Sequence, residues 1–504
     1  MSLAVAELVK QGAVIQCSNT NVKDQFLSKI FLADKPNGKK RFILNLKPLN
    51  NIISSPHFKM ENFETVSRLL QVNHFMTSID LKDAYFAVPV HLSDRKYLRF
   101  YFLGKMFEFT CLPFGLSSAP YTFTKLMKPV VESLRRSGIT CVNYLDDFLI
   151  IGDSEIDCRI KTDVAVKLLV SLGFIINWEK SVLLPSQSCK FLGFIFNTKN
   201  MTIKLPESKI EKIVKRSTFL SSQKSCKVKT LAQFLGFLVS ACPAVKYGWL
   251  YTKSLEREKY LALLQNNMNY NSVMKLTARN SSDLLWWASN IKKSFNALKK
   301  NQFDLIVFTD ASLSGWGAVC KNESTRGWWT TVEKENHINF LELQAIFYGL
   351  KFFAKSYSHL NILIRTDNTT ALSYINRMGS VRYPKLNSLS RQIWQWCERR
   401  NIWLAAAYIN TKDNWKADQE SRTLPPETEW SLASYAFEKI IKAFGRPLID
   451  LFASKNNFKC PKYVSWQKDP GSMAVDAFTI SWSNLFFYAF PPFSMILRSI
   501  QKIS

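Results

Sequence analysis

Two adjacent aspartates, Asp146 and Asp147, lie between two apolar runs of the chain, residues 139–143 and 148–152. Apolar runs separated by so few residues predict a tight β-hairpin with both carboxylates at its tip. Neighbouring carboxylates repel each other unless a cation is bound beside them. We therefore expect a cation site at this tip, although an Asp-Asp pair taken alone is most often ordinary turn chemistry.

A third carboxylate is available for the same site, because Asp80 ends the apolar run Phe75–Ile79. If Asp80 converges with Asp146 and Asp147, the three side chains can hold two divalent cations about 3.5–4 Å apart, as nucleotidyl transfer requires. This convergence is the geometric assumption on which the hypothesis of nucleotidyl transfer depends.

The charge of the chain favours a polyanionic partner. The net charge is +28, from 67 Lys and Arg against 39 Asp and Glu, and nucleic acid is the usual partner of such a protein. A basic but otherwise ordinary enzyme is the alternative. With 504 residues, of which 47% are hydrophobic, the chain is folded and long enough for about three or four domains.

The cysteines and the apolar runs bear on the cellular compartment. Ten cysteines occur singly, without a C-x-x-C pair, a pattern that argues against a zinc module and a disulfide framework. The N-terminus lacks a basic-then-apolar signal pattern, and no apolar run approaches about 20 residues. We therefore expect an intracellular protein, cytoplasmic or nuclear, without a membrane span.

Three further segments carry polar or small residues at predicted turns. Residues 35–41 contain Asn37-Gly38, which favours a tight hairpin whose basic residues could clamp a triphosphate; a solvated hairpin is an equal alternative. Residues 112–120 form a small-residue turn where backbone could approach a nucleotide, or a plain loop. Lys180 could protonate a leaving pyrophosphate, or be an ordinary surface lysine.

These segments, in this order, resemble the fingers and palm of reverse transcriptases over residues 26–200. The resemblance implies that Asp80, Asp146 and Asp147 bind metal. It implies nucleotide contacts through Lys35, Arg41, Asp83, Ala84, Tyr85, Phe114 and Lys180, and a primer grip at Phe191, Leu192, Gly193 and Phe194. Tyr85 would be the steric gate against a ribose 2′-OH, which disfavours the alternative of an RNA-dependent RNA polymerase.

A second set of acids lies at or near the ends of predicted elements in residues 305–422: Asp310, Glu342, Asp367 and Asp418. Each alone is most often a cap or a solvated group. Together, on a β-β-α-β-α pattern, they resemble the Asp-Glu-Asp-Asp cluster of the ribonuclease H fold, which implies two cations and cleavage of RNA in an RNA–DNA hybrid. Residues 408–413 lack the histidine that many retroviral ribonuclease H domains have there. The resemblance therefore implies metal binding more directly than it implies the rate of cleavage or of product release.

The patterns predict an α+β multidomain chain, a right-hand polymerase followed by an α/β ribonuclease H-like domain and a small C-terminal segment. The predicted divisions are 1–204 (fingers and palm), 205–303 (helical thumb/connection), 304–424 (ribonuclease H-like) and 425–504 (unknown role). Basic residues 209–216 suit contact with a duplex backbone, or a solvated helix face. Residues 445–454 and 488–493 are similar to the segment after ribonuclease H in DIRS-type (tyrosine-recombinase) retrotransposons.

The sequence thus predicts an RNA-directed DNA polymerase with ribonuclease H activity that copies retroelement RNA into DNA. The expected cofactor is Mg²⁺, two ions per active site, with Mn²⁺ as a substitute. The expected partners are an RNA template, a DNA primer, the RNA–DNA hybrid and deoxynucleoside triphosphates. The alternative is a decayed copy that only binds nucleic acid as a scaffold, and the presence of every expected acid favours the enzyme.

Overall fold

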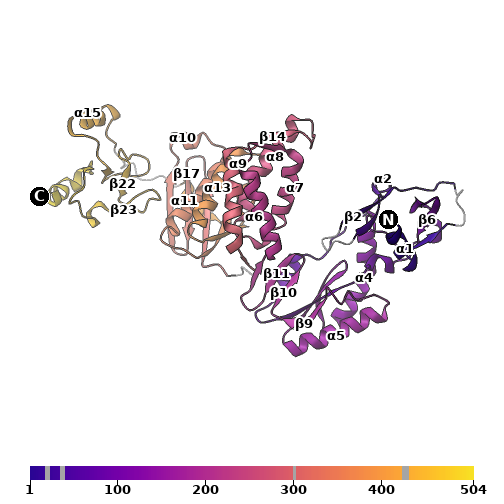
Figure 1. Cartoon of the computed structure of the whole chain (residues 1–504). Helices are drawn as coiled ribbons and strands as arrows, with labels where there is room; N and C mark the ends of the chain where they lie inside the picture. Colours follow the sequence, from indigo (N-terminus) through magenta and orange to yellow (C-terminus); the bar gives the residue numbers. More distant parts are fainter. Residues whose placement is uncertain (18–22, 35–39, 299–301, 423–430, 504) are drawn as a thin grey trace. The chain divides into compact units, whose positions relative to one another are not determined.

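The structure is a computed structural model that describes residues 1–17, 23–34, 40–298, 302–422 and 431–503 (Figure 1). The chain divides into two compact units. Unit 1 comprises Met1–Ile210 and Ser294–Lys299, and unit 2 comprises Glu211–Lys293 and Lys300–Ser504. No helix among the described residues is long and apolar enough to cross a membrane. The finer division into four domains stays a prediction.

The central sheet of unit 1 is antiparallel, with the strand order β7-β8-β4-β9. Its strands are β4 (Phe75–Asp80), β7 (Thr140–Tyr144), β8 (Asp147–Gly152) and β9 (Val182–Ser186). The inner strand β8 is an apolar run that is buried from Phe148 to Gly152, as expected for a strand covered on both faces. The predicted hairpin over 139–152 is confirmed, since β7 pairs with β8 across the Leu145-Asp146 turn.

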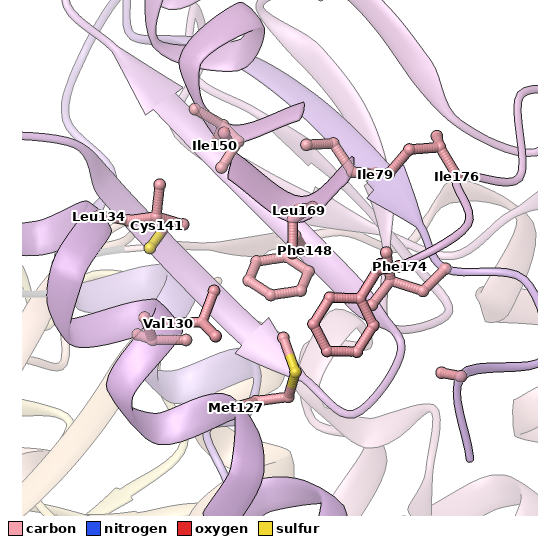
Figure 2. Packing of buried hydrophobic residues seen from close by; sticks show 14 of the residues in the cluster. Ile79, Met127, Val130, Leu134, Cys141, Phe148, Ile150, Leu169, Phe174 and Ile176 are labelled. Carbon is pink, nitrogen blue, oxygen red and sulfur yellow. The ribbon is translucent and has the colours of Figure 1, made fainter. Parts of the chain in front are cut away.

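Two helices, α4 (Ala119–Arg136) and α5 (Glu155–Ser171), pack against this sheet. Figure 2 shows Phe148 and Phe174 among the buried side chains between them, with Met127 and Val130 from α4. Burial of such side chains is the main stabilising contribution to a core of this kind. The apolar pattern of these segments therefore fixes the position of the end of the sheet at which β4 finishes with Asp80 and β8 begins with Asp147.

The other elements of unit 1 form three small sheets and several short helices. The hairpin predicted at residues 30–44 is confirmed as an antiparallel pair of β2 and β3, but its turn, including Lys35, lies outside the described residues. β15 (Asn296–Ala297) pairs with β12, so the chain returns to unit 1 after the helical segment. The remaining elements are α1 (Ser2–Lys10), β1 (Val14–Gln16), β2 (Ile30–Asp34), β3 (Lys40–Leu44), α2 (Lys47–Asn50), α3 (Phe63–Leu69), η1 (Ala84–Ala87), η2 (Leu92–Tyr97), β5 (Arg99–Phe102), β6 (Lys105–Phe109), β10 (Ser188–Phe191), β11 (Phe194–Asn197) and β12 (Thr202–Lys204).

Unit 2 begins with a helical part. Helix α6 (Glu207–Ser221) leads into it. Its other elements are β13 (Ser225–Lys227), α7 (Val228–Val239), η3 (Cys242–Ala244), η4 (Gly248–Thr252), α8 (Lys253–Gln265), β14 (Val273–Lys275), α9 (Ala278–Asn290) and η5 (Ile291–Lys293). A salt bridge joins the buried Asp283 of α9 to Arg391 in the following part of unit 2, and such a buried charge is stable only when it is paired.

The second part of unit 2 is built on a five-stranded sheet with the order β18-β17-β16-β19-β20. β16, β17 and β18 are antiparallel, whereas β19 and β20 continue parallel to β16. The elements are β16 (Leu305–Ala311), β17 (Gly315–Cys320), β18 (Glu323–Trp328), α10 (Thr331–Lys334), α11 (Ile338–Phe353), β19 (Asn361–Thr366), α12 (Thr369–Asn376), α13 (Pro384–Glu398), β20 (Trp403–Tyr408) and α14 (Trp415–Arg422). The predicted β-β-α-β-α pattern is incomplete, because it lacks the polar edge strand β18 and the α13–β20 pair.

The C-terminal part forms a small parallel sheet with the order β23-β22-β21-β24. Its elements are α15 (Ser434–Phe444), β21 (Ile449–Asp450), β22 (Lys462–Ser465), β23 (Ala474–Val475), η6 (Ala477–Thr479), β24 (Phe487–Tyr488), η7 (Phe493–Met495) and α16 (Ile496–Ile503). A salt bridge of 3.0 Å from Lys455 to Glu333 links this part to α10. Asp450 accepts backbone N–H groups of Phe452 and Lys459, as a structural aspartate does.

Candidate active sites

The sheet of unit 1 brings the three predicted carboxylates together. In the register of β4 and β8, Asp80 lies opposite Asp147, and the backbone N–H of Leu81 donates to the carbonyl of Asp146 at 2.9 Å. The hairpin tip therefore faces the end of β4. Asp80 is held from the other side, because its Oδ1 accepts from Asn177 Nδ2 at 2.7 Å and its Oδ2 lies 3.5 Å from Lys180 Nζ.

The acids of this cluster disfavour each other's ionisation. Burial, followed by the charges of Asp146 and Asp80, raises the pKa of Asp147 to about 6. Burial and the charge of Asp80 also raise the pKa of Asp146, against the opposing effect of Lys180 and Arg41. A carboxylate cluster with these properties favours a bound cation, and its all-oxygen donors suit Mg²⁺ or Mn²⁺.

Among the described residues, several of those predicted to contact a nucleotide lie near the same end of the sheet. Asp83 has a φ of +48° and precedes η1, which begins at Ala84. The Tyr85 ring lies 5.3 Å from the Phe114 ring, and the Arg41 guanidinium lies 5.7 Å from Phe114. Arg41, Asp83 and Phe114 line one cavity of about 200 Å³.

Tyr85 contacts Phe114, which lines this cavity, and also lies near the acids. Burial, and then the charge of Asp146, raises the pKa of Tyr85 to about 12, so the phenol stays neutral beside the carboxylates. Lys180 has a side chain that is 68% exposed, and its ammonium lies beside Asp80. The arrangement thus places an aromatic wall, an arginine and a lysine around the acid cluster.

The predicted primer grip is the turn between β10 and β11. Leu192 and Gly193 both have positive φ, 48° and 76°, which makes a two-residue turn whose second position suits glycine. The rings of Phe191 and Phe194 are buried, at 4% and 6% exposure. Any contact of this turn with a strand of nucleic acid would therefore come from Leu192 and Gly193, and not from the two rings.

Unit 2 contains a tighter group of acids. The ligand atoms of Asp310, Glu342 and Asp367 all lie within 4.8 Å of one another, the one such group among the described residues. Burial, and then the charges of Asp310 and Asp367, raises the pKa of Glu342 to about 9. Ser421 Oγ donates to Asp310 at 2.7 Å and Thr411 Oγ1 donates to Asp367 at 2.7 Å.

Asp418 lies close to this group without completing it. It is carried by α14, which packs so closely on β17 that a Cβ on Gly317 would lie 2.4 Å from the Ala417 carbonyl oxygen. Its charge contributes to the raised pKa of Asp310, after burial and Asp367. Its carboxylate is engaged by Arg422 at 2.6 Å. The three central acids fit a hard divalent cation, whereas Asp418 is ion-paired with Arg422 and is not one of this group.

Comparisons with known proteins relate part of the chain to a family. Residues 33–196 match the family described as "Reverse transcriptase (RNA-dependent DNA polymerase)". The "Enzymatic polyprotein" of Figwort mosaic virus (strain DxS) is 26% identical over 406 residues, which are 76% of this chain and 56% of the relative. That of Cauliflower mosaic virus (strain Strasbourg) is 26% identical over 414 residues, 77% of this chain and 56% of the relative. The chain thus spans little more than half the length of these relatives.

Solved structures show the same fold. The foamy viral protease-reverse transcriptase dRH in complex with double-stranded DNA has a TM-score of 0.51 and 19% identity, covering 84% of this chain and 70% of that one. The same viral protein in complex with an RNA/DNA hybrid has a TM-score of 0.50 and 19% identity, covering 85% of this chain and 54% of that one. The chain therefore has a polymerase-like α+β fold.

Proposed function

We propose that this chain, whose residues 33–196 match the reverse transcriptase family, is an RNA-directed DNA polymerase that also degrades the RNA strand of RNA–DNA hybrids. The observation that carries the polymerase proposal is the register that pairs Asp80 with Asp147 beside Asp146. The ribonuclease H proposal depends on the group of Asp310, Glu342 and Asp367 on the five-stranded sheet.

In the polymerase site, Asp80, Asp146 and Asp147 would hold two Mg²⁺ ions. Bound there, the ions would stabilise the charge on the attacking and leaving oxygens of an in-line displacement. Arg41 would bind the triphosphate, and Lys35, outside the described residues, is proposed for the same role. Lys180 would give a proton to the leaving pyrophosphate.

Selection of the sugar would depend on Tyr85. Its ring contacts Phe114 and Phe123 at centroid distances of 5.3 and 5.5 Å, so the neighbouring rings limit its freedom to move aside. A fixed ring beneath the sugar would exclude a ribose 2′-OH and accept a deoxyribose. Deoxynucleoside triphosphates are accordingly the proposed substrates.

In the ribonuclease H-like site, proposed for residues 304–424, Asp310, Glu342, Asp367 and Asp418 would hold Mg²⁺ for hydrolysis of an RNA phosphodiester. Ser421 orients Asp310, and Thr411 orients Asp367, through the hydrogen bonds described above. Because Thr411 lies in the loop that lacks a histidine, it gives this loop a polar contact with the acids.

The partners proposed are an RNA template, a DNA primer and their hybrid. The net charge of +28 supports a polyanion, and related folds were solved with double-stranded DNA and with an RNA/DNA hybrid. Origin in a DIRS-type retrotransposon is proposed from residues 445–454 and 488–493 alone. An intracellular location is proposed from the ten isolated cysteines, which include no C-x-x-C pair.

Primer extension tests the polymerase proposal. A homopolymer RNA template with a DNA primer, deoxynucleotide and Mg²⁺ should give extended products with the parent chain and none with Asp146→Asn. Asp153→Asn is the matched control, because Asp153 directly follows β8 and its side chain is 83% exposed. Binding of the hybrid without extension by the parent would favour the scaffold alternative.

A further inference from the structure

The strand that leads into the turn with Asp146, β7, is an edge strand of its sheet. Two side chains from outside the sheet form hydrogen bonds with backbone groups of β7. Arg135 Nη2 donates to the carbonyl of Cys141 at 2.8 Å, and Glu61 Oε2 accepts from the backbone N–H of Asn143 at 2.8 Å. Arg135 and Glu61 are also ion-paired with each other. This pair therefore provides hydrogen-bond partners for backbone groups of β7 that a further strand would otherwise pair with.

The turn next to this edge contains an unfavourable backbone conformation. Leu145 has a φ of +54° and is the first of two residues between the paired Tyr144 and Asp147, a position that favours glycine. Asn143 Nδ2 donates to the Leu145 carbonyl at 2.8 Å. A strained residue of this kind persists only where its surroundings hold it.

Asn143 links the two features, because its backbone is held by Glu61 while its side chain holds the turn. We infer that Glu61 and Arg135 are positioning residues that keep the turn, and with it Asp146 and Asp147, opposite Asp80. This inference rests on the proposed polymerase function and adds to it residues that no acidic or apolar pattern indicates.

Kinetics separates a positioning role from a merely structural one. A displacement of catalytic groups by about 1 Å can cost about 100-fold in rate, whereas a pair that only stabilises unit 1 would leave the rate of folded molecules unchanged. A loss of positioning should therefore lower kcat, leave KM for the deoxynucleotide nearly unchanged, and raise the Mg²⁺ concentration at half-maximal rate.

Glu61→Gln in the full chain is the first variant, because glutamine keeps an oxygen for the Asn143 N–H but loses the charge that holds Arg135. We expect kcat of primer extension to fall about 10-fold or more, with KM changed less than about twofold. Arg135→Lys should act in the same direction, since Nη2 of Arg135 donates to both the Glu61 carboxylate and the Cys141 carbonyl, and the shorter lysine side chain does not bring its ammonium to that position. The double variant should lose no more than the worse single variant.

Glu132→Gln is the matched control. Glu132 lines the same cavity of about 740 Å³ as Glu61 and Arg135, but its ion pair is with the exposed Arg136 on α4. Its extension rate should equal that of the parent. Cleavage of an RNA–DNA hybrid by each preparation reports whether unit 2 is intact.

The outcomes are distinct. A parent-like kcat in both Glu61→Gln and Arg135→Lys overturns the inference and leaves the polymerase proposal standing. Equal losses of extension and hybrid cleavage indicate general unfolding and count against a positioning role. A parent chain that extends no primer overturns the polymerase proposal, and the inference falls with it.

Discussion

Replacing Glu342 by glutamine should stabilise the metal-free protein while removing a proposed metal ligand. The side chain is 4% exposed, its Oε2 has no hydrogen-bond partner among the described residues, and Asp310 and Asp367 lie beside it. Burial and these two charges raise the pKa of Glu342 from 4.5 to about 9. In the folded chain the group is thus protonated at pH 7, whereas in the unfolded chain it is ionised.

The size of the effect follows from this difference in proton binding. The unfolded pKa of 4.5 lies roughly 2.5 pH units below pH 7, and each pH unit is worth about 1.4 kcal/mol. The free energy of unfolding is therefore about 3 kcal/mol lower at pH 7 than at pH 4. The sign is that of an acid whose folded pKa is raised: stability is greatest below pH 4.5 and is lost as the pH rises toward 9. Glutamine does not titrate, so Glu342→Gln should gain about 3 kcal/mol at pH 7 and nothing near pH 4.

Hydrogen exchange of the full chain in EDTA measures this gain locally. Peptides from β16 and α11 report the opening free energy of the sheet and helix that carry Asp310 and Glu342. Local exchange is preferable to a global melt, because a chain of two units does not unfold in one step. Mg²⁺ should add protection in the parent and much less in Glu342→Gln.

Glu333→Gln provides a control of opposite sign. Burial opposes ionisation of Glu333, but hydrogen bonds from Tyr348 and Thr330 and the charge of Lys455 outweigh it and lower its pKa. Glu333→Gln should therefore reduce protection of the same peptides from hydrogen exchange. The reduction should be larger at pH 7 than at pH 4, because a carboxylate with a lowered pKa stabilises the fold only where it is ionised. If Glu342→Gln left the protection of α11 unchanged from pH 5 to pH 9, the attribution of a buried, protonated carboxyl to Glu342 would be wrong.

Three further outcomes follow from the geometry. Asp310→Asn should abolish hybrid cleavage and retain primer extension, as read from labelled hybrids on a gel; retained cleavage would remove Asp310 from the site. Tyr85→Ala should admit ribonucleotides, increasing their incorporation about 10-fold or more in primer extension, and unchanged selectivity would refute the steric gate. Gly317→Ala should displace α14, lower the free energy of unfolding by about 1–3 kcal/mol and impair hybrid cleavage. Gly236→Ala is the control, because a Cβ there meets open space: it should leave the free energy of unfolding unchanged or raise it, and should leave cleavage unchanged.

The parts of the fold that the sequence predicts are those with a strong local signal. The hairpin of β7 and β8 follows from two apolar runs with two acids between them, and its position is confirmed. The turn of β2 and β3 was indicated by Asn37-Gly38, and the two strands pair as expected. In both cases the signal lies within about 15 residues of sequence, where periodicity and turn chemistry decide the conformation.

The parts that could not be predicted depend on contacts between distant residues. Nothing local to Glu61 indicates a partner at Arg135 or Asn143, because each of these polar residues alone is typical of a solvated surface. The strands β21, β23 and β24 have only two residues each. So short a strand shows no alternation of apolar and polar residues in the sequence. Phe191 and Phe194 pair with each other across the predicted primer grip, and only their burial in the folded chain reveals that both rings point inward.

Both acid clusters also contain a feature that stability alone does not favour. In unit 1 the feature is a buried Asp147 beside two other acids. In unit 2 it is Glu342, a buried carboxyl with an unpaired oxygen. Such costs persist only if the surroundings hold them or a ligand offsets them. Because Asp147 and Glu342 carry oxygen donors on a strand and a helix, a divalent cation is the ligand that would offset both costs, and neither a capping role nor a solvated surface accounts for either.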